Sequence, residues 1–389
     1  MTTRSIISAI KFILIVAFIY MIGVAYSNHD AYLRMSSMIA IVFGVLFLVS
    51  FNWITPFSRS KFLKRILLLF VLICFSSLVF CTINDKFQLV EEVRELLIPV
   101  AALLIGYNLK LKDRTILIII AIYAIVVIVL IGSRIATDLG SFYIEEATTF
   151  VGKNTVGVML CAVGAIGIQM AYSQNCKPAE RITSGIFFII SLIYLLTIRG
   201  RTATLGLIVI FLFTTILFLV RYKTSTSFKI VLSILSILLI INFLTPFEII
   251  PGSQAYVHDS FFLGKEKDVL SDRGVRNAQA IDIIKISPLL GRLTLDYNVE
   301  WVHNYPLLKM SNFGLLGSTP WMIMYLYILV TVIKSLFRLK TFNIQDVGYI
   351  MMLSPFFISL GEPTLPYGPG TVTVLNFIFL GNSIRHSNL

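Results

Sequence analysis

The run TATLGLIVIFLFTTILFLV, residues 202–220, contains no charged side chain and is long enough to cross a bilayer as a helix. A membrane-spanning helix needs about 20 predominantly apolar residues. Runs of similar composition recur along the chain, and short polar connections separate them. Inside a bilayer the backbone N–H and C=O groups must bond to each other, which only helices and closed barrels achieve. The recurring runs therefore predict an all-α polytopic membrane protein.

The composition supports the same fold class. Hydrophobic residues make up 57% of the 389 residues and charged residues only 13%, and the mean hydropathy is +0.88. A soluble protein of this size would carry roughly twice that charged fraction. We expect a single integral membrane domain over residues 1–389, without a separate soluble domain.

The apolar runs predict about twelve membrane spans. The first, 6–26, is long enough to span, so we interpret it as an uncleaved first helix rather than a signal peptide. The runs at 96–109, 184–198, 347–361 and 371–384 are shorter than the others. The full set of expected spans is 6–26, 35–54, 66–83, 96–109, 115–133, 155–172, 184–198, 202–220, 230–247, 316–336, 347–361 and 371–384.

Basic and acidic residues separate into alternate connections between these runs. Short cytoplasmic loops of membrane proteins carry an excess of Lys and Arg. On that rule both termini face the cytoplasm, and the long connection 248–315 is one extracytoplasmic loop with short helices. The net charge of +12 belongs to these loops, so no nucleic-acid partner is expected. The basic side comprises Arg4, Arg59, Lys61, Lys64, Arg65, Lys110, Lys112, Arg114, Lys177, Arg181, Arg221, Lys223, Lys229, Arg338, Lys340 and Arg385.

The four cysteines do not form a metal-binding or disulfide pattern. Cys74, Cys81 and Cys161 lie in apolar runs, Cys176 lies in a basic connection, and none belongs to a CxxC pair. Clustered carboxylates with the spacing of cation ligands are also missing near the end of the long loop. We therefore expect no zinc site, no disulfide framework and no metal requirement.

The largest polar segment, SDRGVRNAQAIDIIKISPLLGRLTLDYNVEWVHN, occupies residues 271–304. Apolar residues recur in it every three positions from Val275 to Ile284, which predicts a helix. Ser271 is the candidate N-cap of this helix. The helix should end before Pro288, because proline lacks an amide hydrogen and disfavours helical backbone in the preceding residue.

Two arginines and a histidine make this segment a candidate binding site. Arg273 and Arg276 are three residues apart, so both project from one side of the first helical turn. A lone histidine in a loop usually has a surface or structural role. His303, however, is followed by Asn304 and lies between the basic helix and the return to the membrane. We expect a functional role for His303, with Asn304 assisting, in a site for an anionic ligand.

A second pair of arginines lies in the short turn IRGRT, residues 198–202. Basic residues are disfavoured on the expected outer side, and snorkelling towards lipid headgroups is one explanation for them. We favour the other, that Arg199 and Arg201 face an anionic ligand at the membrane surface. Lys153 and Asn154 begin a nearby span from the same side, where they either join this pocket or act as an ordinary interfacial anchor.

The chain returns to the membrane through SNFGLLGSTP, residues 311–320. Gly314 and Gly317 lie three residues apart in this segment. Small residues at such spacing allow two backbones to approach closely. We therefore expect close packing at these two glycines.

The sequence resembles the O-antigen ligase and O-antigen polymerase superfamily of bacterial inner-membrane proteins in four features, which occur in the family's order. The resemblance covers roughly residues 150–330, and it rests on the order and membrane sidedness of the motifs rather than on any one of them. The features are GRTA at 200–203 opening an apolar run, Arg273 beginning a helix that leads to PLLG at 288–291, HN at 303–304 followed by two leucines, and GLLG at 314–317.

The resemblance implies glycosyl transfer from an undecaprenyl-diphosphate-linked glycan at the periplasmic face of the inner membrane. The donor's diphosphate leaves as an anion, which fixed cations stabilise. The planar fork of arginine binds phosphate oxygens in pairs. We expect Arg201 and Arg273, with Arg199 and Arg276, to hold the diphosphate. His303 would act as general base or orient the attacking sugar hydroxyl.

Three functions remain open on these residues. A polymerase would join lipid-linked repeat units to each other, whereas a ligase would attach the finished chain to lipid A–core. We favour the polymerase because the loop is compact and because HNYPLLKMSNFGLLG, residues 303–317, is more similar to polymerases. A flippase for lipid-linked oligosaccharide is less favoured, because most runs carry no charge in their interior. No cofactor is expected, and the expected partners are the lipid-linked oligosaccharide, membrane lipid and, as a further candidate, a chain-length regulator protein.

Overall fold

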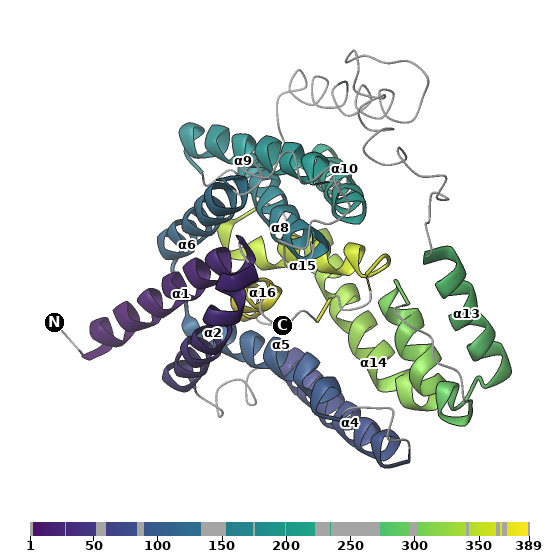
Figure 1. Ribbon diagram of the computed structural model, residues 1–389. Helices are drawn as coiled ribbons and strands as arrows, with labels where there is room; N and C mark the ends of the chain where they lie inside the picture. Colours follow the sequence, from purple (N-terminus) through teal and green to yellow (C-terminus); the bar gives the residue numbers. More distant parts are fainter. Residues whose placement is uncertain are drawn as a thin grey trace.

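The computed structural model is an all-helical bundle (Figure 1). Helices make up 89% of the described residues, which include no strand. This confirms the expected all-α class. The structure describes residues 3–27, 29–51, 60–83, 89–133, 153–173, 176–198, 200–221, 234, 273–295, 302–339, 342–362, 366–367 and 372–387.

Helices lie at the positions of the expected spans, apart from 230–247, of which the structure describes only residue 234. The helices are α1 (Thr3–Ser27), α2 (His29–Ser50), α4 (Lys61–Ile83), α5 (Leu89–Leu109), α6 (Asp113–Val126) with the π-helical turn η1 (Val127–Ile131), α8 (Lys153–Tyr172), α9 (Pro178–Thr197), α10 (Arg201–Arg221), α13 (Arg273–Ile286), η2 (Gly291–Thr294), α14 (Tyr305–Arg338), η3 (Ile344–Asp346), α15 (Val347–Ile358) and α16 (Val374–His386).

Seven of the described helices are long and apolar enough to cross a membrane. They are α1, α4, α6 with η1, α8, α9, α10 and α14. Three of the other expected spans fall short for identifiable reasons. The apolar part of α2 is limited to Arg34–Ser50, and α15 and α16 have only 12 and 13 residues. The count of about twelve therefore stays a prediction.

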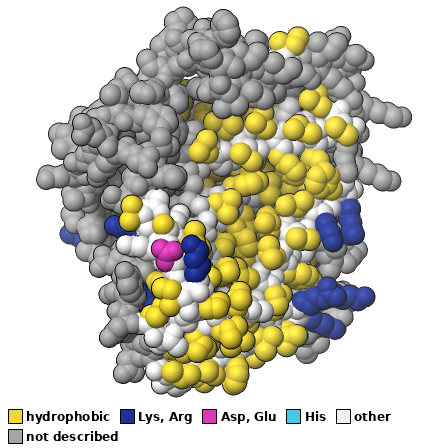
Figure 2. Space-filling model, turned by 90° about the vertical axis from the view of Figure 1, so that its right-hand side faces the viewer, with side chains coloured by type: hydrophobic (Ala, Val, Ile, Leu, Met, Phe, Trp, Pro, Cys, Tyr) yellow, Lys and Arg dark blue, Asp and Glu magenta, His cyan; other side chains and the backbone are white. Residues whose placement is uncertain are grey.

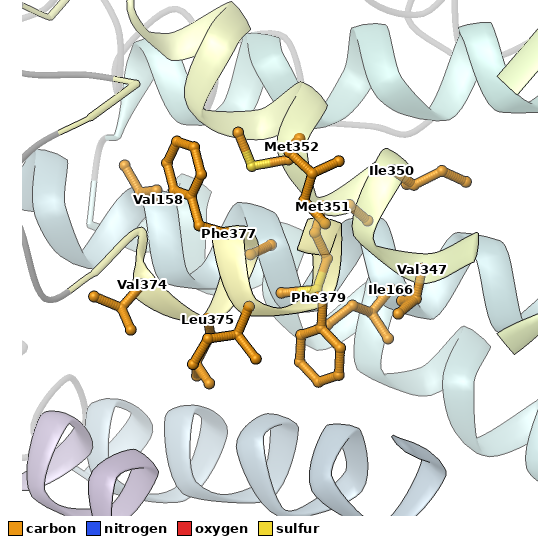
Figure 3. Packing of buried hydrophobic residues seen from close by; sticks show 14 of the residues in the cluster. Val158, Ile166, Val347, Ile350, Met351, Met352, Val374, Leu375, Phe377 and Phe379 are labelled. Carbon is orange, nitrogen blue, oxygen red and sulfur yellow. The ribbon is translucent and has the colours of Figure 1, made fainter. Parts of the chain in front are cut away.

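The short helices α15 and α16 form the interior of the bundle (Figure 1). Every residue of α16 from 374 to 384 is buried, and Phe357 is the one residue of α15 that is not. Figure 3 shows their Val, Ile, Met and Phe side chains packed together with residues of α8. Glycines permit this depth of burial, since a Cβ on Gly106 of α5 would lie 1.8 Å from the carbonyl oxygen of Ile378 in α16.

The outer helices carry large apolar side chains on their exposed faces. Examples are Phe75 in α4, Ile182 in α9 and Leu316 in α14, which are 66%, 67% and 62% exposed. Figure 2 shows a broad apolar surface with Lys and Arg side chains along one edge. Such a surface suits lipid acyl chains, and the basic edge suits the boundary of a bilayer.

Side-chain hydrogen bonds join several helix ends at one end of the bundle. Segments expected on the cytoplasmic side join through Gln345, which donates from Nε2 to the carbonyl oxygen of Leu111 (3.2 Å) and accepts from Asn382 Nδ2 (2.8 Å). Ser173 also donates to the carbonyl oxygen of Phe342 (2.9 Å). We call this the Gln345 end of the bundle. The opposite end, called the Asn304 end, comprises the starts of α8, α10 and α14 and the end of α15.

Candidate functional site

A kink divides α14 near the Asn304 end. Gly314 has φ 59° and ψ −172°, which interrupts the helical backbone. Residues 305–313, called the outer half-helix, form a separate helical piece before this kink. The left-handed region is readily accessible only to glycine, so residue type fixes the position of the kink.

The PLLG turn packs directly against this kink. Gly291 also has a positive φ of 61°, and a Cβ on it would lie 2.5 Å from the amide nitrogen of Gly314. The amides of Leu315 and Leu316 donate to the carbonyl oxygens of Pro288 (2.8 Å) and Leu289 (3.1 Å). The close packing expected at Gly314 is confirmed, and two of the expected motifs are joined backbone to backbone.

The expected helix of the polar segment is present as α13. It ends at Ile286, before Ser287 and Pro288 as predicted, whereas the candidate N-cap Ser271 lies outside the described residues. The side of α13 that packs against the protein is not the side formed by the apolar residues that predicted the helix. Val275 and Ile281 are 63% and 43% exposed. The buried residues of α13 are instead Ala280 and Ile283.

Ala280 and Ile283 of α13 pack against Val302, and Leu295, Leu307 and Leu308 surround them. Val302 immediately precedes His303, so this small core places α13 beside the start of the outer half-helix. Arg276 is half-buried on α13. Arg273 is the first helical residue, and its side chain lies outside the described part.

Hydrogen bonds tie the HN motif to the end of α15. The amide of Tyr305 donates to the carbonyl oxygen of Ser359 (3.0 Å), and Asn304 Nδ2 donates to that of Leu360 (3.2 Å). Asn304 Oδ1 accepts from the amide of Leu307 (3.0 Å), which makes Asn304 the N-cap of α14. The structure thus gives Asn304 a positioning role next to the half-buried His303.

The GRTA motif reaches the same place from α10. A Cβ on Gly361, at the end of α15, would lie 2.7 Å from Thr202 Cγ2. In the same way, a Cβ on Gly157 of α8 would lie 2.9 Å from the Cβ of Ala203. The starts of α8 and α10 therefore adjoin the segment that holds Asn304 and Tyr305.

The four expected motifs thus form one continuous set of contacts at the Asn304 end. Thr202 touches Gly361, the neighbouring Leu360 binds Asn304, and the outer half-helix joins α13 and the PLLG turn. The placement of individual cations is not part of this finding. Arg199 and the side chains of Arg201, Arg273, Lys153 and Asn154 lie outside the described residues.

A further basic residue, Arg292, lies in the 3-10 turn η2 directly after Gly291. It is partly buried, and this burial lowers the pKa of its guanidinium group below the ordinary value. Arginine stays protonated in proteins even after such a shift. Arg292 therefore brings a fixed positive charge to the turn that packs on the kink of α14.

The structure also shows a buried charged group that the sequence analysis did not single out. Lys309 Nζ donates to Glu92 Oε2 and to Glu95 Oε2, at 2.7 Å each. The Lys309 side chain is only 3% exposed. Its Nζ lies 4.2 Å from the ring centre of Trp321 and 5.3 Å from that of Tyr305. We call these three charged residues the lysine–diglutamate cluster.

Sequence carried a partial signal for this cluster. Lys309 is the one charged residue between positions 301 and 333, and such an isolated charge close to an apolar run marks a candidate functional residue. Glu92 and Glu95 lie just before the expected span 96–109 and belong to none of the motifs described above. Their pairing with Lys309 depends on contacts over more than 200 residues of chain, as their separations of 217 and 214 show.

Within the described ranges, no group of three or more His, Cys, Asp or Glu side chains is arranged to hold a metal ion. The four cysteines are free thiols.

Comparisons with known proteins add no assignment to this geometry. No protein-family model matches the chain, and a search of curated proteins finds no match. A function for the Asn304 end therefore has to be argued from its residues and contacts.

Proposed function

We propose that this chain is a membrane glycosyltransferase, an O-antigen polymerase of the bacterial inner membrane. It would transfer glycan from an undecaprenyl-diphosphate-linked donor to a lipid-linked acceptor repeat unit at the periplasmic face. The proposal includes about twelve spans, cytoplasmic termini and a periplasmic loop over residues 248–315. One observation carries it: GRTA at the start of α10 lies against Gly361, next to the Leu360 that binds Asn304, and so adjoins the segment 273–317 that holds the other three motifs.

The proposed reaction is a displacement at the first carbon of the donor glycan. The acceptor hydroxyl oxygen forms a bond to that carbon, and the bond from the carbon to the phosphate oxygen breaks. Polyprenyl diphosphate leaves with the bonding electron pair, and the hydroxyl proton passes to His303. Histidine suits this role because it titrates near neutral pH.

Stabilising the leaving diphosphate is the main electrostatic task of this reaction. Guanidinium groups from α10 and α13 would converge on it, with Arg201 and Arg273 as the principal ligands and Arg199 and Arg276 beside them. Each binds two phosphate oxygens through its planar fork and keeps its charge. Cations fixed in place before the reaction stabilise developing charge efficiently in a partly dry site. These groups supply positive charge without a metal ion.

Alanine variants in proteoliposomes test the proposed site. We expect Arg201→Ala, Arg273→Ala and His303→Ala each to lose nearly all turnover of purified lipid-linked repeat units, while membrane insertion and thermal stability stay as in the wild type. Lys285→Ala is the matched control, because Lys285 is an exposed basic residue of α13 that pairs with the equally exposed Asp282. Wild-type turnover in all three site variants would remove the proposal.

Deletion of the gene distinguishes the acceptors. A polymerase predicts lipopolysaccharide core that carries one repeat unit. A ligase, which differs only in transferring the chain to lipid A–core, predicts bare core with long lipid-linked chains accumulating. Bare core with lipid-linked units retained on the cytoplasmic side would instead indicate a flippase.

A further inference from the structure

The outer half-helix, residues 305–313, is joined to α5 by charge. α5 packs its backbone against α16 and α4, whereas Lys309 reaches across from α14 to Glu92 and Glu95 at the start of α5. Because Lys309 lies in the second turn of the half-helix, a shift of the half-helix would stretch both ion contacts. The lysine–diglutamate cluster therefore opposes movement of this piece relative to α5.

The contacts of the cluster have a fixed geometry, whereas apolar packing has no preferred direction. The ammonium group contacts a carboxylate oxygen from each glutamate and lies over the Trp321 ring, so its position is fixed from several sides. Buried ion pairs seldom add stability over apolar residues of similar volume, but some of them specify a unique arrangement. Apolar side chains could fill the same buried space in a membrane protein. The charged cluster is therefore a candidate for fixing the position of the half-helix rather than for adding stability.

What the half-helix carries is the HN motif. Asn304 caps its first turn, and Tyr305 is fully buried with its ring centre 5.6 Å from that of Tyr367. The hydrogen bonds of Asn304 and Tyr305 to the end of α15 hold the motif from one direction. The lysine–diglutamate cluster holds the HN motif from the opposite direction, through Lys309, which lies one helical turn after Tyr305.

We propose that Lys309, held by Glu92 and Glu95, is a positioning residue for glycosyl transfer. It sets the direction of the outer half-helix and so places His303 against the acceptor hydroxyl. The inference rests on the proposed function, and it adds three residues from outside the motifs of the resemblance. Because the guanidinium groups proposed to hold the donor diphosphate lie on α10 and α13, loss of the cluster should lower the rate of transfer more than donor affinity.

The test compares a neutral variant with the wild type in proteoliposomes. Lys309→Met, Glu92→Gln and Glu95→Gln together remove all three charges at nearly constant volume and leave no buried charge unpaired. We expect kcat to fall about ten- to a hundredfold, because small misplacements of a reacting group cost that much. The KM for the lipid-linked donor should stay within about twofold. Because unfolded enzyme would also lower the apparent kcat at constant KM, the folded fraction of each variant is measured by thermal unfolding and the rates are divided by it.

Amide hydrogen exchange gives a second readout that does not depend on activity. Exchange of residues 305–313 should rise at least about tenfold in the neutral variant, while exchange of α16 stays unchanged. If the wild type transfers no glycan, the proposed function fails, and the exchange result still decides whether the cluster holds the half-helix. Unchanged kcat or unchanged exchange of residues 305–313 would each overturn the positioning role.

Two further variants keep this test decisive. Lys285→Met with Asp282→Asn removes the exposed ion pair of α13, and we expect no change in kcat or exchange. Glu92→Gln alone retains the Lys309–Glu95 pair, so it should fold even where the neutral variant does not. It should raise exchange of residues 305–313 and lower kcat, each by less than the neutral variant; no effect on either would also overturn the proposal.

Discussion

Thr202 lies against Gly361 so closely that no side chain fits between them. A Cβ built on Gly361 would be 2.7 Å from Thr202 Cγ2 and 3.0 Å from Thr202 Oγ1. Real side chains do not approach at such distances, so a larger residue at position 361 must push the start of α10 away. This contact links the arginine-bearing turn to the segment that binds Asn304.

Gly361→Ala should therefore lower turnover without unfolding the protein. The added methyl group displaces the start of α10, and with it Arg201, from the HN motif. Thr202→Ala removes both clashing atoms, so the double variant Thr202→Ala with Gly361→Ala should recover turnover relative to Gly361→Ala alone. Steady-state rates in proteoliposomes provide the measurement. A double variant no more active than Gly361→Ala would contradict this contact as the cause.

Gly314→Ala should destabilise the protein by at least about 2 kcal/mol. Alanine disfavours the positive φ of this position, and its Cβ would lie 2.3 Å from the carbonyl oxygen of Leu289. Gly185→Ala in α9 is the matched control, because a Cβ there meets nothing within 4 Å. The control should be neutral or stabilising by up to about 1 kcal/mol. Thermal unfolding in detergent compares the two, and equal Tm values would contradict the backbone contact.

Two substitutions at Asn304 distinguish its role as the N-cap of α14 from its hydrogen bond to Leu360, after the end of α15. Asn304→Ala should lower stability by about 1 kcal/mol, because the amide of Leu307 loses its acceptor. Asn304→Asp keeps an acceptor for Leu307 but loses the amide that donates to Leu360. The Asp variant should therefore keep the cap on Leu307, lose less stability than Asn304→Ala, and lose turnover. Full activity in the Asp variant would show that the bond to Leu360 does not position the HN motif.

Arg273→Lys should be nearly as damaging as Arg273→Ala, with turnover reduced about tenfold or more. Lysine keeps the positive charge but cannot bind two phosphate oxygens through a planar fork. Lys285→Arg, on the same helix and exposed, should be silent. Initial rates with lipid-linked donor provide the comparison. Wild-type rates for Arg273→Lys would indicate that charge alone suffices at this position.

Several parts of the fold were predictable because local chemistry decides them. The run 202–220 became α10, since an uncharged stretch of that length satisfies its backbone in a bilayer only as a helix. Pro288 predicted the end of α13, because proline cannot extend a helix. Gly314 predicted a close backbone approach, because it lacks a Cβ.

Burial within the bundle was not predictable in the same way. The spans in α8 and α9 have nearly equal hydropathy, 1.7 and 1.6, yet 89% of the first and 17% of the second is buried inside the protein. Lipid and protein interior are both apolar, so hydropathy cannot distinguish a helix at the centre from one at the edge. The central position of the short helix α16 likewise depends on its neighbours.

The sequence by itself determined which segments are helical, where proline and glycine interrupt them, and which ends carry basic residues. Only the tertiary structure decided that Lys309 meets Glu95, 214 positions earlier in the chain, and that the four motifs adjoin one another. The physical reason is the range of the interactions. Backbone hydrogen bonding and residue shape act within a few positions, whereas charge pairing and close packing depend on which helices are neighbours.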